Sequence, residues 1–186
     1  MGVHADAVKV LAEWRPGDTA QESLRQAYLG FLAAREDSCE RSCAAGHLTA
    51  SAVVFDGDQV LLTLHPRVGK WLQLGGHCEP ADETLAGAAL REATEESGID
   101  GLTIDPLPVH LDVHPITCSL GVPTRHFDVR FVVHAPPGSR PKISDESDDL
   151  RWWAIADVPN EELRPMIDAA RSRDSRAARN GARAGA

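Results

Sequence analysis

Apolar residues near the start of the chain recur at intervals of three and four, the period of an α-helix. Pro16 and Gly17 interrupt this pattern and divide residues 1–46 into two predicted helices. Thr19 and Glu22 have the spacing of a capping box at the start of the second helix. The apolar stripes consist of Ala7, Val8, Val10, Leu11 and Trp14 in the first helix, and of Leu24, Ala27, Tyr28, Phe31 and Leu32 in the second.

From Leu48 onward the apolar period shortens to the one typical of β-strands. Two such segments flank Asp56-Gly57-Asp58, which predicts a hairpin. The predicted strands are 48–56, 59–65, 102–116, 125–135 and 151–155, and a short apolar run, WLQL, precedes the glycine pair. A closing helix is predicted over residues 159 to about 172. The last dozen residues have little apolar content to bury and are predicted to be disordered. Strands on both sides of a central helix, with helices at each end, predict a sheet covered on two faces.

The helical period returns between Gly75 and Ile99, where good helix formers end at Gly98 and predict a helix over about 84–97. Its acidic residues stand at i, i+3 and i+4, so they project from one face. These residues are Glu92, Glu95 and Glu96, and the apolar stripe beside them is Ala86, Ala89, Leu90 and Ala93. The acidic face therefore borders a buried surface.

This acidic face is unfavourable in isolation, because like charges repel at i, i+4 and the helix dipole is negative at this end. Each effect costs roughly 0.2–1 kcal/mol. A hard divalent cation would turn the repelling carboxylates into its ligands. The alternative is a solvated acidic face. Because the face borders a buried surface, we interpret it as a magnesium site.

The segment from Gly76 to Ile99 resembles the signature of the Nudix hydrolases, G-x5-E-x7-R-E-U-x-E-E-x-G-U, where U is a bulky aliphatic residue. The matching residues are Arg91, Glu92, Glu95, Glu96, Gly98 and Ile99, and Ala93 is a small residue at the first U position. Six residues instead of five separate Gly76 from Glu83. Either Asp82 or Glu83 could therefore occupy the position of the first signature glutamate.

The resemblance implies an α/β fold, the Nudix-type α/β/α sandwich with a mixed β-sheet, and the predicted N-terminal helices form an extension before it. The expected organisation is an extension over 1–46 that packs on the core, a Nudix hydrolase domain over 47–172, and a disordered tail over 173–186. The extension could pack on the core, shape the substrate pocket or make a homodimer contact, and the sequence does not choose among these.

The resemblance also implies Mg²⁺ as cofactor, with Mn²⁺ as a substitute, held by Glu92, Glu95 and Glu96. It adds a backbone carbonyl of Gly75 or Gly76 and a carboxylate from a loop late in the domain. Glu146, six residues before Trp152, is the candidate for that late carboxylate, as a second-metal ligand or general base. A plain solvated acidic turn is the alternative there. Glu92 and Glu146 remain rivals for the general base.

In the family the signature arginine, here Arg91, pairs with an acidic residue of the loop and orients the site. Arg67 and Lys70 precede the glycine pair and are candidate contacts for a terminal phosphate, with ordinary solvent-exposed charges as the alternative. His77, directly after Gly76, is a candidate substrate contact.

Histidines form two further patterns. On the predicted strands, His110, Asp112 and His114 alternate, as do His126 and Asp128. If these strands pair, the histidines could converge into a metal or phosphate pocket near Arg125 and Arg130; the alternative is the polar face of half-buried strands. Cys39, Cys43 and His47 repeat every four residues, which would align them on a continuing helix as zinc ligands. No fourth ligand is evident, and buried or frayed thiols are the alternative.

Composition narrows the function classes. With 186 residues and 42% hydrophobic content, the chain is long enough for one domain with a core. The formal net charge of -9 disfavours nonspecific binding to nucleic acid or anionic membranes. No long apolar run or signal-peptide pattern is present, which predicts a cytoplasmic protein. The four cysteines include no C-x-x-C pair, so we expect reduced thiols and no disulfide.

These observations lead to a function hypothesis with two rivals. The first is a Mg²⁺-dependent hydrolase in which metal-activated water cleaves a phosphoanhydride bond of a nucleoside diphosphate derivative or nucleoside triphosphate. A catalytically inactive Nudix-fold module that senses or binds nucleotides is favoured only by the extra residue before Glu83, and the three intact glutamates oppose it. An isopentenyl diphosphate isomerase shares the fold, but its distinctive Cys and Glu context is not apparent.

Overall fold

The computed structural model describes residues 2–117, 121, 123–143 and 147–173. Three helices are α1 (Val3–Glu13), α2 (Thr19–Ala34) and α3 (Leu85–Ser97), and residues 164–173 form a further helix at the end of the described chain. The strands are β1 (His47–Asp56), β2 (Gln59–His65), β3 (Lys70–Leu72), β4 (Leu74–His77), β5 (Thr103–Ile104), β6 (His110–Thr117), β7 (Pro123–His134) and β8 (Asp149–Ala154). Short 3-10 turns cover Ile155–Asp157 and Glu161–Leu163.

The strands form one mixed sheet with β1 near its centre. The main path runs β3-β2-β1-β7-β5, while β4 pairs with β1, β6 with β7 and β8 with β2. β1 and β7 are parallel, and the other pairs are antiparallel. The predicted hairpin is confirmed, with Asp56 opposite Gln59. Gly57 has a φ of 58°, the conformation that glycine adopts most readily in such a turn.

The alternating residues of β1 divide the core into two sides, because successive side chains of a strand point to opposite faces. On one face, Leu48 and Ala50 pack with Leu85, Ala88 and Ala89 of α3, and Ala52 and Val54 pack with Ala93. On the other face, Val53 and Phe55 pack with Leu163, Met166 and Ile167 from the end of the chain. The remaining residues of that second face are polar: His47, Thr49 and Ser51.

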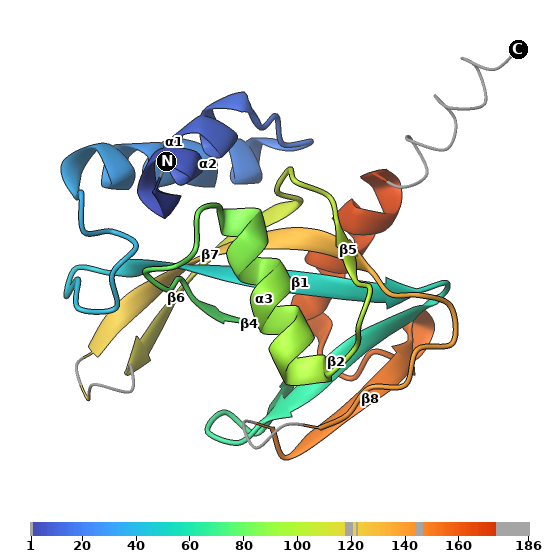
Figure 1. The fold of residues 1–186 in the computed structure, drawn as a ribbon. Coiled ribbons are helices and arrows are strands. Elements are labelled where there is room, and N and C mark those ends of the chain that lie inside the picture. The colour runs from blue at the N-terminus through green and yellow to red at the C-terminus, as the bar shows by residue number, and fades with distance from the viewer. Residues whose placement is uncertain (1, 118–120, 122, 144–146, 174–186) are drawn as a thin grey trace, which may run out of the picture.

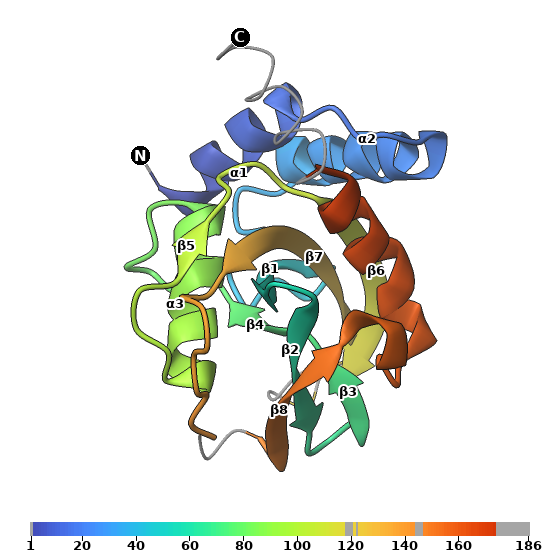
Figure 2. The ribbon, with the colours of Figure 1, turned by 90° about the vertical axis from the view of Figure 1, so that its right-hand side faces the viewer.

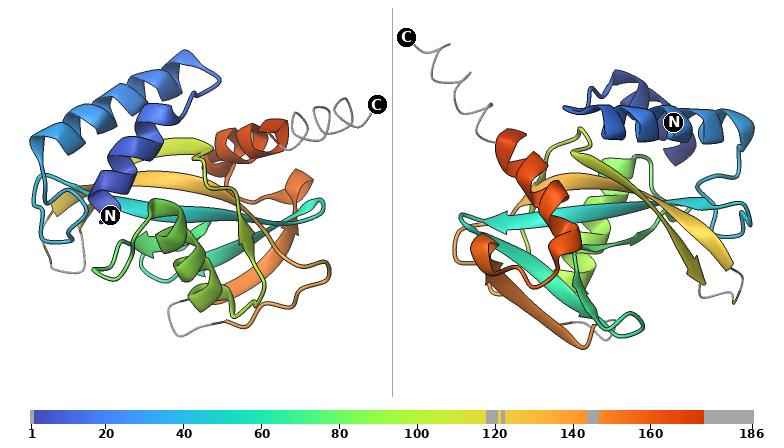
Figure 3. Two further views of the ribbon diagram at one scale, coloured as in Figure 1. Left: turned by 45° about the horizontal axis from the view of Figure 1, so that its top comes forward. Right: turned by 180° about the vertical axis from the view of Figure 1, so that it is seen from behind.

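The helices lie on both faces of the sheet, as predicted. α3 covers the sheet in front and the helix at 164–173 lies behind it (Figure 1). The side view and the view from behind show the same layers (Figures 2 and 3). The N-terminal helices lie across one side of this sandwich, where Ala7, Leu11, Tyr28 and Leu32 join the core cluster of α3 and β1. None of the helices in the described ranges is long and apolar enough to cross a membrane.

Several predicted boundaries near the N-terminus were wrong. Asp18, and not Thr19, caps α2, because its carboxylate accepts a hydrogen bond from the Gln21 amide at 2.8 Å. Helix α2 ends at Ala34, and the chain then runs through turns up to residue 46. A continuing helix would have been needed to align Cys39, Cys43 and His47. Cys39, Cys43 and Cys78 are free thiols, and Cys118 lies outside the described residues.

The remaining elements follow the sequence more closely. The predicted strand at 102–116 is two strands, β5 and β6, separated by the proline-containing segment 105–109. Helix α3 begins after Thr84, whose hydroxyl accepts from the Gly87 amide, and ends at Gly98 with a φ of 60°. Its buried residues are Leu85, Ala88, Ala89, Ala93 and Ser97, so Ala86 and Leu90 are less buried than the predicted stripe required. The predicted disordered tail lies almost wholly outside the described residues.

Candidate functional site

The glycine pair of β4 lies against the acidic face of α3. Gly75 has a φ of 144°, and a Cβ there would lie 2.5 Å from the Cα of Ser51. A Cβ on Gly76 would lie 2.7 Å from the carboxylate of Glu92. The Gly75 amide donates a hydrogen bond to Oε2 of Glu96 at 3.2 Å. Glycine at position 76 therefore lets the Glu92 carboxylate approach the backbone, and glycine at position 75 lets β4 approach Ser51 of β1.

Arg91 joins the loop to the helix. Its guanidinium donates two hydrogen bonds to Asp82, at 3.2 and 3.0 Å, and one to the carbonyl of His77 at 3.1 Å. It also donates to Glu92 at 3.0 Å and to Glu95 at 3.1 Å. The Asp82 hydrogen bonds are the main cause that raises the pKa of Arg91, and the group stays positive. One arginine thus orients the loop, the end of β4 and two glutamates.

The structure distinguishes the two candidates for the first signature glutamate. Asp82 has a side chain 7% exposed and forms the bidentate pair with Arg91, whereas Glu83 is exposed. Five residues separate Gly76 from Asp82, the signature spacing, so the extra residue falls between Asp82 and Arg91. Burial raises the pKa of Asp82, but hydrogen bonds from Arg91 and the Glu79 amide outweigh it, and the net pKa is lowered.

The charges around Arg91 fit a hard cation. Carboxylates of Glu79, Asp82, Glu92 and Glu95 lie within 3.9 Å of its guanidinium, and Glu96 lies nearby at Gly75. Five carboxylates therefore lie around Arg91 and the glycine pair. The side-chain atoms that could bind a metal next to the glycine pair are carboxylate oxygens, the ligand atoms that Mg²⁺ prefers. The residues present therefore fit a hard divalent cation near Glu92, Glu96 and the glycine pair.

The other predicted site residues lie in different surroundings. Glu95 is 60% exposed and contacts Arg91. Lys70 forms an exposed ion pair with Glu162 at 2.9 Å, and Arg67 is exposed in the turn between β2 and β3. Glu146 lies outside the described residues.

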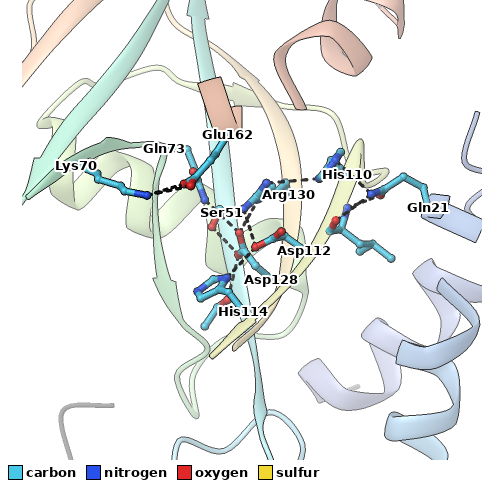
Figure 4. A network of polar contacts seen from close by, with 12 residues as sticks. Gln21, Ser51, Lys70, Gln73, His110, Asp112, His114, Asp128, Arg130 and Glu162 are labelled. Atoms are coloured by element: carbon cyan, nitrogen blue, oxygen red, sulfur yellow. Dashed lines mark hydrogen bonds and ion pairs between the residues drawn. The ribbon is translucent and has the colours of Figure 1, made fainter. Parts of the chain in front are cut away.

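A buried polar network occupies the second face of the sheet (Figure 4). Asp128, 2% exposed, accepts hydrogen bonds from Thr49 at 3.0 Å and Ser51 at 2.6 Å. Gln73 and Arg130 donate to its other oxygen at 3.2 and 2.8 Å. Both oxygens of this buried carboxylate are therefore satisfied, which its burial requires.

The two histidine-bearing strands, β6 and β7, pair as predicted. Their histidines do not converge on one pocket but lie in two different surroundings. Register places His114 opposite His126 and His110 opposite Arg130. Asp112 accepts from His114 at 2.8 Å, and this hydrogen bond raises the pKa of His114 and lowers that of Asp112. His110 instead contacts Gln21 of α2 at 3.2 Å.

His110 is expected to make the free energy of unfolding depend on pH. Burial, then the nearby Arg130, lower its pKa to about 4, against the opposing effect of Asp112, Asp128 and Asp18. The pKa of this imidazole is about 6.5 in the unfolded chain. Its contribution to stability is full above that pH and is lost as the pH falls towards its pKa in the folded protein. The free energy of unfolding should therefore fall between pH 7 and pH 4 in wild type. We expect this fall to be about 2 kcal/mol smaller in His110→Gln.

Urea denaturation of the metal-free protein at several pH values measures this difference. His134→Gln, which replaces an exposed histidine, is the control and should follow wild type. Parallel pH curves for wild type and His110→Gln would contradict the prediction.

A histidine cluster lies beyond this network. Three histidines, His47, His77 and His126, each place one ring nitrogen within 4.8 Å of the ring nitrogens of the others. Among the residues described, the three glutamates of α3 do not form a group as close as this. Burial is the main cause that lowers the pKa of His77 to about 3 and that of His126 to about 4. The sequence pointed to His126 and His77 but associated His47 with cysteines, because pairing of β1 with β7 is not visible in the local pattern.

The geometry of the loop and helix agrees with comparisons to known proteins. The family model for the NUDIX domain matches residues 46–173. The chain belongs to the Nudix hydrolase family. Membership confirms the family, the mixed α/β sandwich and the hydrolase assignment predicted from the signature. The match begins one residue before β1 and ends with the last described residue, so α1 and α2 precede it.

Solved Nudix structures share this fold. A NUDIX-family hydrolase from Clostridium perfringens is 26% identical, with a TM-score of 0.51 over 67% of this chain and 95% of that one. An Ap4A hydrolase from C. elegans is 19% identical, with a TM-score of 0.53 over 69% and 97%. The E. coli dihydroneopterin triphosphate pyrophosphohydrolase is 23% identical, with a TM-score of 0.52 over 65% and 92%. The last two likenesses concern the fold alone.

Proposed function

We propose that this Nudix protein uses Mg²⁺, or Mn²⁺ in its place, to cleave a phosphoanhydride bond in a nucleoside diphosphate derivative or nucleoside triphosphate. One observation carries the proposal: the carboxylates of Glu92 and Glu96 lie against the Gly75-Gly76 backbone, beside the acidic cluster around Arg91. Membership of the Nudix hydrolase family supports a phosphoanhydride substrate.

Each residue of the loop and helix would have a separate task. Glu92 and Glu96, with Glu95 and a carbonyl of the glycine pair, would hold the cation. When bound, the cation supplies positive charge to the phosphate oxygens and to the attacking water. Arg91 would keep the Glu92 carboxylate and the His77 carbonyl in place through its pair with Asp82. It is a positioning residue.

Hydrolysis also needs a base for the proton of the attacking water. Arg91 donates to Oε1 of Glu92 at 3.0 Å. This contact orients the carboxylate. Glu92 and Glu146 are the two candidates for the base, and the electron pair of the P–O bond leaves with the departing phosphate. Arg67, Lys70 and His77 are the candidate substrate contacts, and Lys70 would exchange a surface ion pair of little energetic value for phosphate.

A substrate panel tests the function. The purified full chain is incubated with Mg²⁺ and nucleoside triphosphates, dinucleoside polyphosphates, nucleotide sugars or ADP-ribose, and phosphate is measured after coupling to a phosphatase. We expect turnover of at least one substrate, lost on addition of EDTA. A thermal shift with a nucleotide but no turnover across the whole panel would overturn the proposal in favour of a nucleotide-sensing module.

A further inference from the structure

Three strands bring His47, His77 and His126 together at one end of the sheet. His47 is the first residue of β1 and lies beside His126 of β7 in the parallel register. His77 is the last residue of β4 and lies opposite Thr49, two positions from His47 on the same face of β1. The start of β1 lies beside β7 and β6 in Figure 1. The rings converge although their residues are far apart in sequence.

The spacing of the rings matches a metal site. The Nε2 atoms of His47 and His77 are 3.1 Å apart. Two nitrogens bound to one tetrahedral zinc ion at 2.0–2.1 Å would be about 3.3 Å apart. Each pair of rings has a centroid distance of 5.0 Å. Small side-chain rotations would bring three nitrogens around a common centre.

A buried nitrogen without a partner points to a ligand. Nε2 of His126 is buried and has no hydrogen-bond partner among the described residues, although His47, itself 1% exposed, packs beside it. Leaving a buried polar atom unsatisfied is unfavourable. A bound cation would use this lone pair and those of the neighbouring rings.

We propose that His47, His77 and His126 form a binding site for a transition-metal ion of the zinc type, distinct from the carboxylate site on α3. Imidazole nitrogens suit Zn²⁺, Co²⁺, Ni²⁺ and Cu²⁺, whereas Mg²⁺ prefers oxygen ligands. Three protein ligands leave a fourth position of a tetrahedral ion for water or another small ligand. The site is next to the glycine pair along the chain, since His77 follows Gly76.

Arg41 contacts one ring of this site. Its Nη2 donates a hydrogen bond to Nδ1 of His77 at 2.7 Å. With Nδ1 accepting, the proton of the neutral ring lies on Nε2, the atom that faces His47. Metal binding at Nε2 requires the proton to move to Nδ1, and Arg41 then has to leave. Because Arg41 is exposed and belongs to a turn, it can move away without disturbing a strand.

Calorimetric titration with Zn²⁺ tests the proposal. The full chain is first treated with EDTA and dialysed, and the titration is done in excess Mg²⁺ so that the carboxylates are occupied. We expect one equivalent to bind wild type and Glu96→Gln alike. Binding should weaken at least tenfold in His126→Gln and in His77→Gln, and should strengthen in Arg41→Gln. His134→Gln, outside the cluster, is the control. Circular dichroism checks that each variant is folded.

X-ray absorption of the zinc-loaded wild type provides a measurement that needs no variant. We expect three imidazole ligands at the zinc edge. Three results would overturn the proposal: zinc ligated by oxygen alone, no binding of Zn²⁺ to wild type, or Zn²⁺ binding that is lost in Glu96→Gln but kept in both histidine variants. None of these results bears on turnover of nucleotides with Mg²⁺, so failure here is separate from failure of the proposed hydrolase function.

Discussion

Glu96→Gln is expected to reduce kcat/KM of Mg²⁺-dependent hydrolysis at least about 100-fold, or about 2.7 kcal/mol of transition-state stabilisation. The Glu96 carboxylate lies at the Gly75 amide, 3.2 Å away, where it can meet the cation that neutralises phosphate charge. Glutamine preserves the size of the side chain but removes the negative charge that a hard cation requires. Steady-state kinetics on the best substrate of the panel measures the loss.

Comparison along the same helix makes this prediction specific. Glu92→Gln should cause a similar loss, since its carboxylate lies against Gly76. Glu95→Gln should cost only about tenfold, about 1.4 kcal/mol, because Glu95 is 60% exposed and contacts Arg91. Glu83→Gln, on the exposed neighbour of Asp82, should have little effect. Equal losses in Glu83→Gln and Glu96→Gln would show that α3 does not hold the catalytic cation.

Asp82→Ala is expected to lower the free energy of unfolding by about 2–3 kcal/mol. The substitution removes both hydrogen bonds to Arg91 and the one that Asp82 accepts from the Glu79 amide at 2.7 Å. Arg91, whose side chain is only 22% exposed, would lose its bidentate partner. Activity should fall as well, because Arg91 also holds Glu92 and the His77 carbonyl. Urea denaturation and steady-state kinetics measure the two effects.

Glu83 provides a matched control for Asp82. Glu83→Ala changes an exposed side chain, and surface changes of this kind stay within about 0.5 kcal/mol of wild type. Asp82→Asn should lie between wild type and Asp82→Ala, because it keeps the shape and one acceptor but not the charge. A larger loss of stability in Glu83→Ala than in Asp82→Ala would assign the signature position to Glu83 instead.

The acidic helix was predictable because its information is local. Residues three and four apart meet on one helix face whatever the rest of the chain does. Thr84, Gly98 and the helix formers between them mark the ends of α3, and Gly57 marks the first hairpin. The same local logic failed at residues 35–46, where a spacing of four suggested a helix but the chain forms turns.

Choices between equivalent neighbours required the tertiary structure. Asp82 and Glu83 are chemically similar and adjacent, and only the packing of the loop on α3 directs Asp82 to Arg91. The histidines show the same limit. His126 is 79 residues from His47, and it lies beside His47 because β1 pairs with β7 in parallel.

The sequence by itself therefore determined the family signature, the acidic face of α3 and most of the helices and strands, since these depend on residues within a few positions of one another. Tertiary structure decided which acid pairs with Arg91, how Asp128 is satisfied and which histidines meet. These contacts depend on strand register and on the packing of a helix against a sheet. Such long-range pairings leave no periodic trace in a single sequence.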